Sequence, residues 1–298
     1  MHEEPLSMDT VKYSKGMECV SVLSDSVITN ELWDELYENG VRMAITRCVG
    51  MEHMNKEYAN SIGIDVFNTS YSSSSVADYT IMMMLMTLRH VRAIIQRYSC
   101  GDFTQIGFQG RELHNMTVGI IGAGSIGITV ARHLSGFGCK IIYWSRTKKT
   151  DMEPFAEYID LNDVLRNSDI ISLHLCANSE TEHIMNKERI TMMTQNAILI
   201  NTGRGSLIDT KALIEALEEK HLSGAALDVV EGDRNIYYHD HKNEIINHHE
   251  MAILNSMPNV LMLPHLAFYT DQAIEDMVHN SFRIISEWKQ KQEKRKVS

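Results

Sequence analysis

The sequence has no excess of positive charge, no long apolar run and no repeats, features that mark nucleic-acid-binding, membrane-spanning and repeat proteins. Its 298 residues include 28 Lys and Arg against 39 Asp and Glu, a formal net charge of −11, which excludes nucleic acid and anionic membrane surfaces as its main partners. The longest apolar stretch, residues 81–88, is far too short to span a bilayer. The first residues, Met-His-Glu-Glu-Pro, are acidic and contain no apolar h-region, so we expect no signal peptide. The chain has no internal repeat and no low-complexity tract.

Cysteine is also scarce and follows no pattern. The five cysteines are odd in number and form no Cys-x-x-Cys pair, which argues against a disulfide framework and favours reduced thiols. We therefore expect a soluble protein that acts in the cytoplasm. Histidine, tyrosine and aspartate gather in residues 231–250, but their spacing matches neither a zinc finger nor a His-Glu-x-x-His motif. We expect no metal there and interpret the segment as a solvated loop.

The most informative feature is a glycine-rich turn in residues 117–127, Thr-Val-Gly-Ile-Ile-Gly-Ala-Gly-Ser-Ile-Gly. A strand-like apolar run leads into it, a helix-like segment follows at 128–137, and a second apolar run begins at Cys139. In this frame the Gly-x-Gly-x-x-Gly spacing predicts a dinucleotide site, with the pyrophosphate at the helix N-terminus. The three glycines would allow, in order, the tight turn, the approach of the pyrophosphate and close helix packing: Gly122, Gly124 and Gly127.

Strand and helix signals alternate along most of the chain, which predicts an α/β fold with parallel sheets, and the length favours two domains. One long, methionine-rich helix is expected over residues 76–98, buried at a domain or subunit interface. A further helix over 210–219 is expected to be capped by Asp209. Other runs are typical of strands: 19–23, 42–46, 66–69, 170–175, 197–201, 225–229 and 260–263.

Three of the expected strands after the glycine turn end in charged or titratable side chains. Arg204 lies between two glycines, Asp228 begins an acidic turn that reaches Asp233, and His265 follows Leu-Pro. Taken alone, the arginine could lie on the surface, the acids could be solvated and the histidine could belong to the core. Ligands of open α/β sheets bind outside the carboxyl ends of the strands, so together these side chains are expected to converge on the dinucleotide. A guanidinium binds a carboxylate, and a histidine paired with an acid donates a proton to a ketone oxygen, which is the chemistry of 2-oxo acid reduction.

These segments resemble the D-isomer-specific 2-hydroxyacid dehydrogenases, and most closely their D-lactate dehydrogenase branch, which includes the enzymes of vancomycin-resistance clusters. The likeness runs from about Pro5 to the end of the chain and includes the long segment 231–256. The shared stretches are residues 46–50, 71–72, 76–78, the glycine turn, 136–138, 201–205, 227–232, 257–259, 264–265 and 268–270.

The resemblance implies two Rossmann-like domains with parallel sheets. Residues 1–70 and 269–298 would form the substrate (catalytic) domain and residues 71–268 the dinucleotide-binding domain. The active site would lie in the cleft, and the dinucleotide-binding domains would form a homodimer. The family's outer domain begins with a strand and a helix before the point that Pro5 matches, so we expect this domain to lack them, with an exposed sheet edge and low stability.

The resemblance also implies roles for single residues. Arg204 would orient the substrate carboxylate and carbonyl, and His265 would donate the proton. The amides of Val49 and Gly50 would hold the carboxylate, with Tyr71 nearby. Asp228 would lie at the nicotinamide or its ribose. The residues that would bind the cofactor are Gly122, Gly124, Ser125, Ile126, Gly127, Leu175, Cys176, Thr181, Thr202, Gly203 and Asp228.

Two positions depart from the family. The catalytic glutamate, five residues after Asp228, is Asp233 here, one methylene shorter, and we expect it still to be the partner of His265. The second strand of the glycine unit ends in Ser145-Arg146-Thr147-Lys148-Lys149, where NAD enzymes place an acid for the ribose 2′-hydroxyl. Ser145 and Arg146 would contact this ribose, and the basic residues would face a 2′-phosphate. We therefore expect NAD(P)(H) as cofactor, with NADPH accepted or preferred.

The sequence thus predicts an NAD(P)-dependent D-2-hydroxyacid dehydrogenase that reduces a 2-oxo acid, with pyruvate favoured and Arg204, Asp233 and His265 as the catalytic residues. Phenylpyruvate and 2-oxoisocaproate are the alternative substrates. A non-catalytic, dinucleotide-sensing protein related to transcriptional co-repressors is the alternative from another class. The presence of Arg204 and His265 argues against it.

Overall fold

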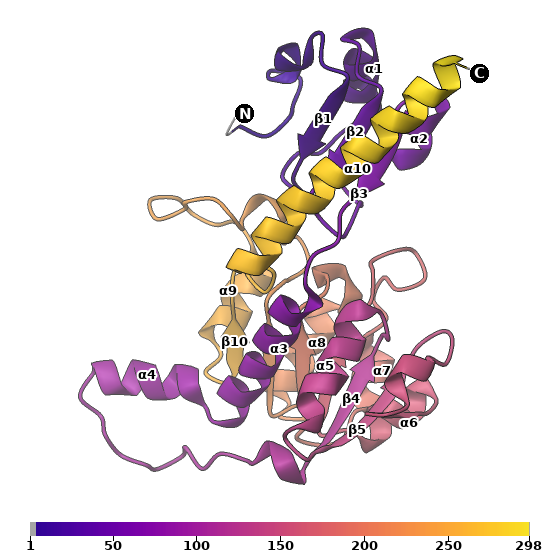
Figure 1. Ribbon diagram of the computed structural model, residues 1–298. Helices are drawn as coiled ribbons and strands as arrows, with labels where there is room; N and C mark the ends of the chain where they lie inside the picture. The colour runs from indigo at the N-terminus through magenta and orange to yellow at the C-terminus, as the bar shows by residue number, and fades with distance from the viewer. Residues whose placement is uncertain (1–3, 298) are drawn as a thin grey trace. The chain divides into compact units, whose positions relative to one another are not determined.

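The computed structural model describes residues 4–297, which divide into two compact units (Figure 1). One unit contains the chain up to Ser72 and again from Tyr269, and the other contains Ser73–Phe268. Each unit is a parallel sheet with helices packed on it, which confirms the predicted α/β fold. Within residues 4–297 no helix has both the length and the apolar character needed to cross a bilayer.

The first unit has a three-stranded parallel sheet in the order β1-β2-β3. Side chains of β2 alternate between its faces: Ala44 packs with the helices α1 and α2, whereas Met43 and Ile45 pack with Trp288 of the last helix, α10. The indole N–H of Trp288 donates a 2.6 Å hydrogen bond to the Asp65 carboxylate, which ties α10 to β3. Among the described residues only the 3-10 helix η1 precedes β1. The bounds are η1 Val11–Ser14, β1 Cys19–Val22, α1 Asn30–Glu38, β2 Met43–Thr46, α2 Lys56–Ser61, β3 Asp65–Asn68 and α10 Asp271–Val297.

The second unit has a seven-stranded parallel sheet in the order β10-β9-β8-β7-β4-β5-β6. From β4 the chain moves outward through β5 and β6, then returns to the other side of β4 with β7 and continues outward to β10. The direction changes between β4 and β7, and ligands of such sheets bind at this switch point. The strands are β4 Thr117–Ile121, β5 Lys140–Trp144, β6 Glu157–Tyr158, β7 Ile170–Leu173, β8 Ile198–Asn201, β9 Gly224–Leu227 and β10 Val260–Met262.

Helices cover both faces of this sheet, which explains why its strands are almost continuously apolar. On one face α3 and α5 bury Met83, Met84 and Leu134, and on the other α6, α7 and α8 bury Val164 and Leu213. The bounds are α3 Ser73–Leu88, α4 Val91–Ser99, η2 Leu113–Asn115, α5 Ser125–Ser135, η3 Thr150–Met152, α6 Leu161–Asn167, α7 Lys187–Met192, η4 Gly205–Leu207, α8 Thr210–Glu218, η5 Asp233–Asn235 and α9 His249–Ser256.

The single helix predicted over residues 76–98 is wrong. The structure has two helices, α3 and α4, and His90 between them has a φ of 53° in the left-handed region. A right-handed helix cannot continue through this conformation. Burial also differs, because Met83 and Met84 are fully buried on α3 whereas α4 has no buried residue. The apolar composition predicted helix but did not locate this break.

The other predicted elements lie within a few residues of their expected bounds. Asp209 caps α8, since its carboxylate accepts the backbone N–H groups of Lys211 and Ala212 at 3.1 Å. The helix after the glycine turn begins at Ser125, three residues earlier than predicted, so its first turn follows Gly124 directly. Residues 231–250 are not loop throughout, because they contain η5 and the first two residues of α9.

Candidate active site

The predicted cofactor residues lie at one edge of the seven-stranded sheet. All seven strands are parallel, so their carboxyl ends share an edge. The glycine turn follows β4, Ser145 and Arg146 follow β5, and residues 174–181 follow β7. Arg204, Asp228 and His265 come after β8, β9 and β10 at this same edge. The structure therefore brings these predicted residues to the switch point and its neighbouring strands.

The glycine turn is closely packed at Gly122 and Gly127 and open at Gly124. Gly122 has a φ of 108°, and a Cβ atom added there would lie 2.3 Å from the His174 carbonyl oxygen. A Cβ on Gly127 would lie 2.0 Å from the Gly122 oxygen, so the helix packs directly on the turn. By contrast, a Cβ on Gly124 would meet nothing within 4 Å, so its backbone faces open space at the N-terminus of α5. The turn thus fits a bound anion.

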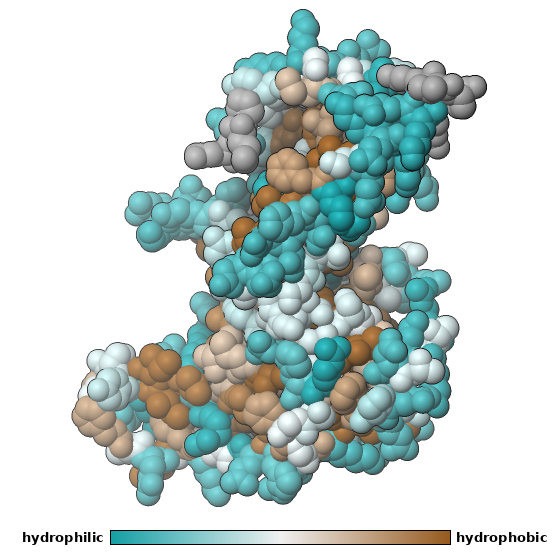
Figure 2. Space-filling model, viewed as in Figure 1, coloured by the Kyte–Doolittle hydropathy of each residue, from teal (hydrophilic) through white to brown (hydrophobic). Residues whose placement is uncertain are grey.

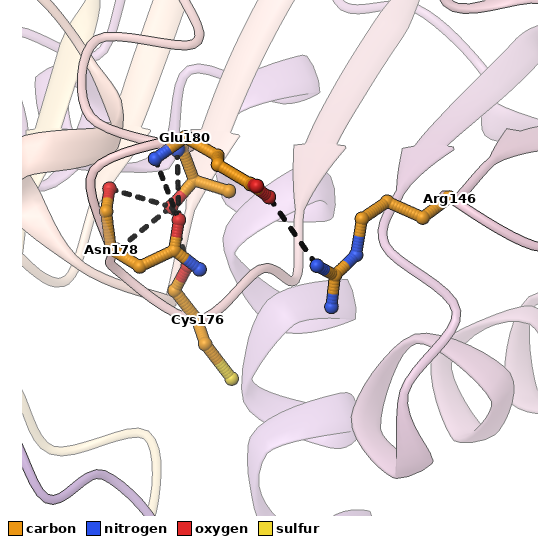
Figure 3. A network of polar contacts seen from close by, with 5 residues as sticks. Arg146, Cys176, Asn178 and Glu180 are labelled. Carbon is orange, nitrogen blue, oxygen red and sulfur yellow. Dashed lines mark hydrogen bonds and ion pairs between the residues drawn. The ribbon is translucent and has the colours of Figure 1, made fainter.

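Next to this turn, the end of β5 is polar and basic. Ser145 is buried and donates its hydroxyl proton to the Thr147 carbonyl oxygen at 2.8 Å. Arg146 Nη1 lies 3.3 Å from Glu180 Oε2 (Figure 3), and Lys148 Nζ lies 2.9 Å from Glu153 Oε1. Two of the three predicted cations therefore already have carboxylate partners. The sequence did not indicate Glu180, because it lies 34 residues from Arg146 and after a different strand.

The turn after β8 is fixed by the Asn201 side chain, for which the sequence predicted no role of its own. Asn201 Oδ1 accepts the backbone N–H of Gly203 at 3.0 Å, and Nδ2 donates to the Arg204 carbonyl oxygen at 2.8 Å. The hydroxyls of Thr202 and Thr80 share a buried 3.0 Å hydrogen bond, which ties the turn to α3. The backbone that carries the Arg204 side chain is therefore held by Asn201 and, through Thr202, by α3.

The turn that carries Arg204 also packs on the acidic turn after β9. A Cβ atom on Gly205 would lie 2.1 Å from the carbonyl carbon and oxygen of Val230 and 2.4 Å from the nitrogen of Glu231. Only a residue without a Cβ allows this approach. The two turns that carry Arg204 and Asp233 are therefore in direct backbone contact.

Asp228 is fully buried and its carboxylate is engaged by the protein. It accepts the backbone N–H groups of Leu266 and Ala267 at 3.1 and 2.9 Å. Burial raises the pKa of Asp228, and these hydrogen bonds partly oppose the rise. Burial, and then the charge of Asp228, raise the pKa of the nearby Tyr79 hydroxyl. The predicted contact of Asp228 with the nicotinamide stays a prediction.

Asp233 is partly buried in a turn of its own. Its Oδ2 accepts the backbone N–H of Val230 at 3.0 Å. Burial raises the pKa of Asp233, while the Val230 hydrogen bond and then the charge of Arg204 act in the opposite direction. His248 also holds this turn. Its Nδ1 accepts the Met251 N–H, so the ring proton is on Nε2, which donates a 2.7 Å hydrogen bond to the Glu231 carbonyl oxygen.

His265 has a φ of 56°, in the left-handed region. The Tyr238 hydroxyl donates a 3.0 Å hydrogen bond to the His265 carbonyl oxygen, and the two ring centroids are 5.7 Å apart. The sequence indicated neither this contact nor the ion pair between His183 Nε2 and Glu231 Oε1, at 2.7 Å. Both pairs join residues that are distant in sequence, which no local pattern reveals.

The three other predicted substrate residues belong to the first unit. Val49 and Gly50 lie in the loop after β2, and Tyr71 follows β3. The Val49 carbonyl oxygen accepts a 2.7 Å hydrogen bond from Asn68 Nδ2, which fixes the loop that presents the two amides. Across residues 4–297 the structure has no group of three or more His, Cys, Asp or Glu side chains that could hold a metal ion.

Comparison with known proteins identifies the family. Residues 81–267 match the model of the NAD binding domain of the D-isomer specific 2-hydroxyacid dehydrogenases. A D-specific alpha-keto acid dehydrogenase of Enterococcus faecium is 39% identical over 288 residues, covering 97% of this chain and 88% of the relative. An aromatic 2-oxoacid reductase of Clostridium sporogenes is 34% identical over 280 residues, covering 93% of this chain and 85% of the relative.

A solved structure shows the same fold. The D-lactate dehydrogenase of Aquifex aeolicus, complexed with NAD and lactic acid, is 31% identical and superposes with a TM-score of 0.84, covering 94% of this chain and 85% of the other. These findings confirm the resemblance noted in the sequence. The chain belongs to the D-isomer-specific 2-hydroxyacid dehydrogenase family and is an NAD(H)-binding oxidoreductase.

Proposed function

We propose that this dehydrogenase reduces a 2-oxo acid, pyruvate before others, to the D-2-hydroxy acid, with His265 as the proton donor. One observation carries the proposal. Arg204, Asp233 and His265 all follow strands that end at the sheet edge where the glycine turn lies. NAD(P)H bound at this sheet edge would supply the hydride. The protein then has to hold the substrate carboxylate and deliver one proton.

Each residue has a separate task in this proposal. The Arg204 guanidinium binds the substrate carboxylate, and its planar fork fixes the carbonyl beside His265. His265 donates its proton to the carbonyl oxygen as negative charge develops there. One Asp233 oxygen accepts the Val230 N–H, and we propose that Oδ1 faces the imidazole and stabilises its protonated form. In the first unit, the amides of Val49 and Gly50 would hold the substrate carboxylate, near Tyr71.

We further propose that NADPH is accepted alongside NADH. No acid stands at the end of β5, and Arg146, Lys148 and Lys149 supply three cations there. Ser145 closes this turn with its hydroxyl, and Arg146 follows it where NAD enzymes place an acid. These residues suit a 2′-phosphate, although Glu180 and Glu153 already pair with two of the cations.

A larger 2-oxo acid is the second candidate substrate, because a relative with 34% identity is an aromatic 2-oxoacid reductase. Phenylpyruvate and 2-oxoisocaproate represent this class. The cytoplasm remains our proposed place of action, since the five cysteines are all free thiols.

We propose that the protein is a homodimer formed through the Ser73–Phe268 unit. Helix α4 and the loop after it expose Ile95, Tyr98, Phe103 and Ile106, each 60% exposed or more. Figure 2 shows this apolar surface over α4 at the lower left. Exposed apolar area of this kind marks an interface. Ile95→Glu together with Tyr98→Glu should yield monomers in sedimentation velocity, and monomeric wild-type protein would contradict the proposal.

The reductase activity is tested by following NADH and NADPH oxidation with pyruvate, phenylpyruvate and 2-oxoisocaproate, and by chiral analysis of the product. We expect the D-product, a raised KM for the oxo acid in Arg204→Lys, and a kcat lower by about 10²–10⁴ in His265→Gln. An L-product, or no oxidation with any of the three acids, would contradict the proposed reaction.

A further inference from the structure

An ion pair joins the two strand ends that flank the glycine turn. Arg146 follows β5 and Glu180 lies beyond β7, the two strands on either side of β4. Arg146 Nη1 and Glu180 Oε2 are 3.3 Å apart, and Figure 3 shows the carboxylate directed at the guanidinium. Because β4 ends at Ile121, just before Gly122, this pair spans the carboxyl end of the strand that leads into the pyrophosphate site.

The backbone of Glu180 is held in place by a closed turn. Asn178 Oδ1 accepts the backbone N–H groups of Glu180 and Thr181, at 2.9 and 3.1 Å. The Thr181 hydroxyl donates a 2.7 Å hydrogen bond to the Cys176 carbonyl oxygen, which joins the turn to the end of β7. The Glu180 side chain can therefore rotate without breaking these bonds, and it does so from a backbone that is held near Arg146.

The pair brings a negative charge to the place where the sequence predicts only positive ones. At the end of β5 a carboxylate that binds the ribose 2′-hydroxyl is typical of NAD enzymes, and a cation there accommodates a 2′-phosphate. In this chain the cation, Arg146, comes from β5, but a carboxylate arrives from the β7 side. A 2′-phosphate that binds Arg146 has to displace Glu180 and then remains close to its charge.

We propose that Glu180 is a specificity-determining residue that weakens the preference for a 2′-phosphorylated dinucleotide by competing for Arg146. The inference rests on the proposed use of NAD(P)H. With a 2′-hydroxyl in the site the Arg146–Glu180 pair stays closed over the turn. With a 2′-phosphate, Arg146 changes partner from a carboxylate to the phosphate, and the Glu180 side chain turns away.

The size of the effect follows from exposure. The two side chains are 78% and 71% exposed, so the pair is solvated and its replacement should change binding only modestly. We expect Glu180→Gln to raise the ratio of affinities, phosphorylated over unphosphorylated, about two- to five-fold at low salt. Because exposed charges are screened, the change should largely vanish at about 0.5 M salt.

The test is calorimetric binding of ADP-ribose and of its 2′-phosphorylated form, at low and high salt. Wild type is compared with Glu180→Gln and with Arg146→Gln. Arg146→Gln should lower the ratio of affinities, and Glu180→Gln should have a smaller effect when it is added to Arg146→Gln than when it is made alone. Glu182→Gln is the matched control, since it removes an exposed carboxylate two residues away and should leave the ratio unchanged.

Three results would overturn the inference, and two of them concern the ratio: a ratio that is equal in wild type and Glu180→Gln, or one that Glu182→Gln raises as much. Wild-type protein that binds neither fragment would overturn it too. Because these fragments carry no nicotinamide, the result is independent of turnover. A shifted ratio without NAD(P)H oxidation would refute the proposed reaction alone, whereas oxidation with an unshifted ratio would refute only the role of Glu180.

Discussion

The Asp228 carboxylate accepts the backbone N–H of Ala267 at 2.9 Å, and this contact fixes the loop that carries His265 to the end of β9. Leu266 donates to the other carboxylate oxygen at 3.1 Å. His265 has a φ of 56°, which is uncommon for a residue with a side chain. We infer that the two hydrogen bonds hold this backbone conformation and so position the imidazole.

Replacement of Asp228 by asparagine should therefore affect stability and turnover together. An amide accepts one of the two N–H groups and turns its own donor toward the other. We expect the free energy of unfolding in urea to fall by about 1–3 kcal/mol and kcat to fall by about ten-fold or more. Asp151→Asn, at an exposed position, should change neither value. Wild-type stability and kcat in Asp228→Asn would show that the buried carboxylate does not position the loop.

Two glycines should respond differently to the same substitution. Gly205→Ala places a methyl group 2.1 Å from Val230, so the turns that carry Arg204 and Asp233 have to separate, and we expect a loss of about 1–3 kcal/mol in stability with greatly reduced kcat. Gly124→Ala meets nothing within 4 Å in the protein. It should keep the melting temperature but raise the KM for the dinucleotide. Equal melting temperatures for both variants would contradict this assignment.

The ion pair of His183 and Glu231 should make stability depend on pH. The hydrogen bond that His183 donates to Glu231, followed by the charges of Glu231, Asp209 and Glu182, raises the pKa of His183 above its ordinary value near 6.5. A raised histidine pKa stabilises the fold fully below the unfolded value, and this contribution disappears as the pH rises through the folded pKa. Glu231→Gln should thus lower the melting temperature at pH 6 more than at pH 8.5.

A neighbouring pair provides the control for this pH dependence. Lys187 Nζ and Glu215 Oε2 are 2.7 Å apart, and the hydrogen bond to Glu215 raises the lysine pKa further above the range of the experiment. Glu215→Gln should therefore cost the same at pH 6 and pH 8.5. The His183 and Glu231 side chains are 39% and 41% exposed, so we expect the Glu231→Gln substitution to cost only about 0.2–1 kcal/mol at pH 6. A Glu231→Gln effect that is equal at the two pH values would rule out a titrating His183.

The shortened acid at position 233 predicts a specific pH–rate profile. If Asp233 stabilises protonated His265, Asp233→Asn should shift the pH dependence of kcat/KM for the oxo acid to lower pH and lower kcat by about 10–100-fold. Asp233→Glu adds the missing methylene and should retain or raise kcat. An Asp233→Asn variant with an unchanged profile would exclude Asp233 as the partner, whatever its effect on stability.

Local patterns predicted the parts of this site that depend on local geometry. The glycine turn, the Asp209 cap and the strand ends before Arg204 and His265 all follow from neighbours in sequence. Glu180 and the Tyr238 contact to His265 could not be predicted this way, because each partner comes from another strand end or loop. The helix break at His90 was missed for a different reason, since hydropathy does not report a single left-handed residue.

The contact of Trp288 with the β2 side chains Met43 and Ile45 has a consequence for the order of folding during synthesis. A ribosome delivers the three strands of the first sheet early, but α10, which covers one of their faces, emerges some two hundred residues later. The Ser73–Phe268 unit can meanwhile close its own core. We expect the nascent sheet to stay a client of chaperones until Trp288 arrives. The sheet that is synthesised first is therefore the last to complete its hydrophobic core.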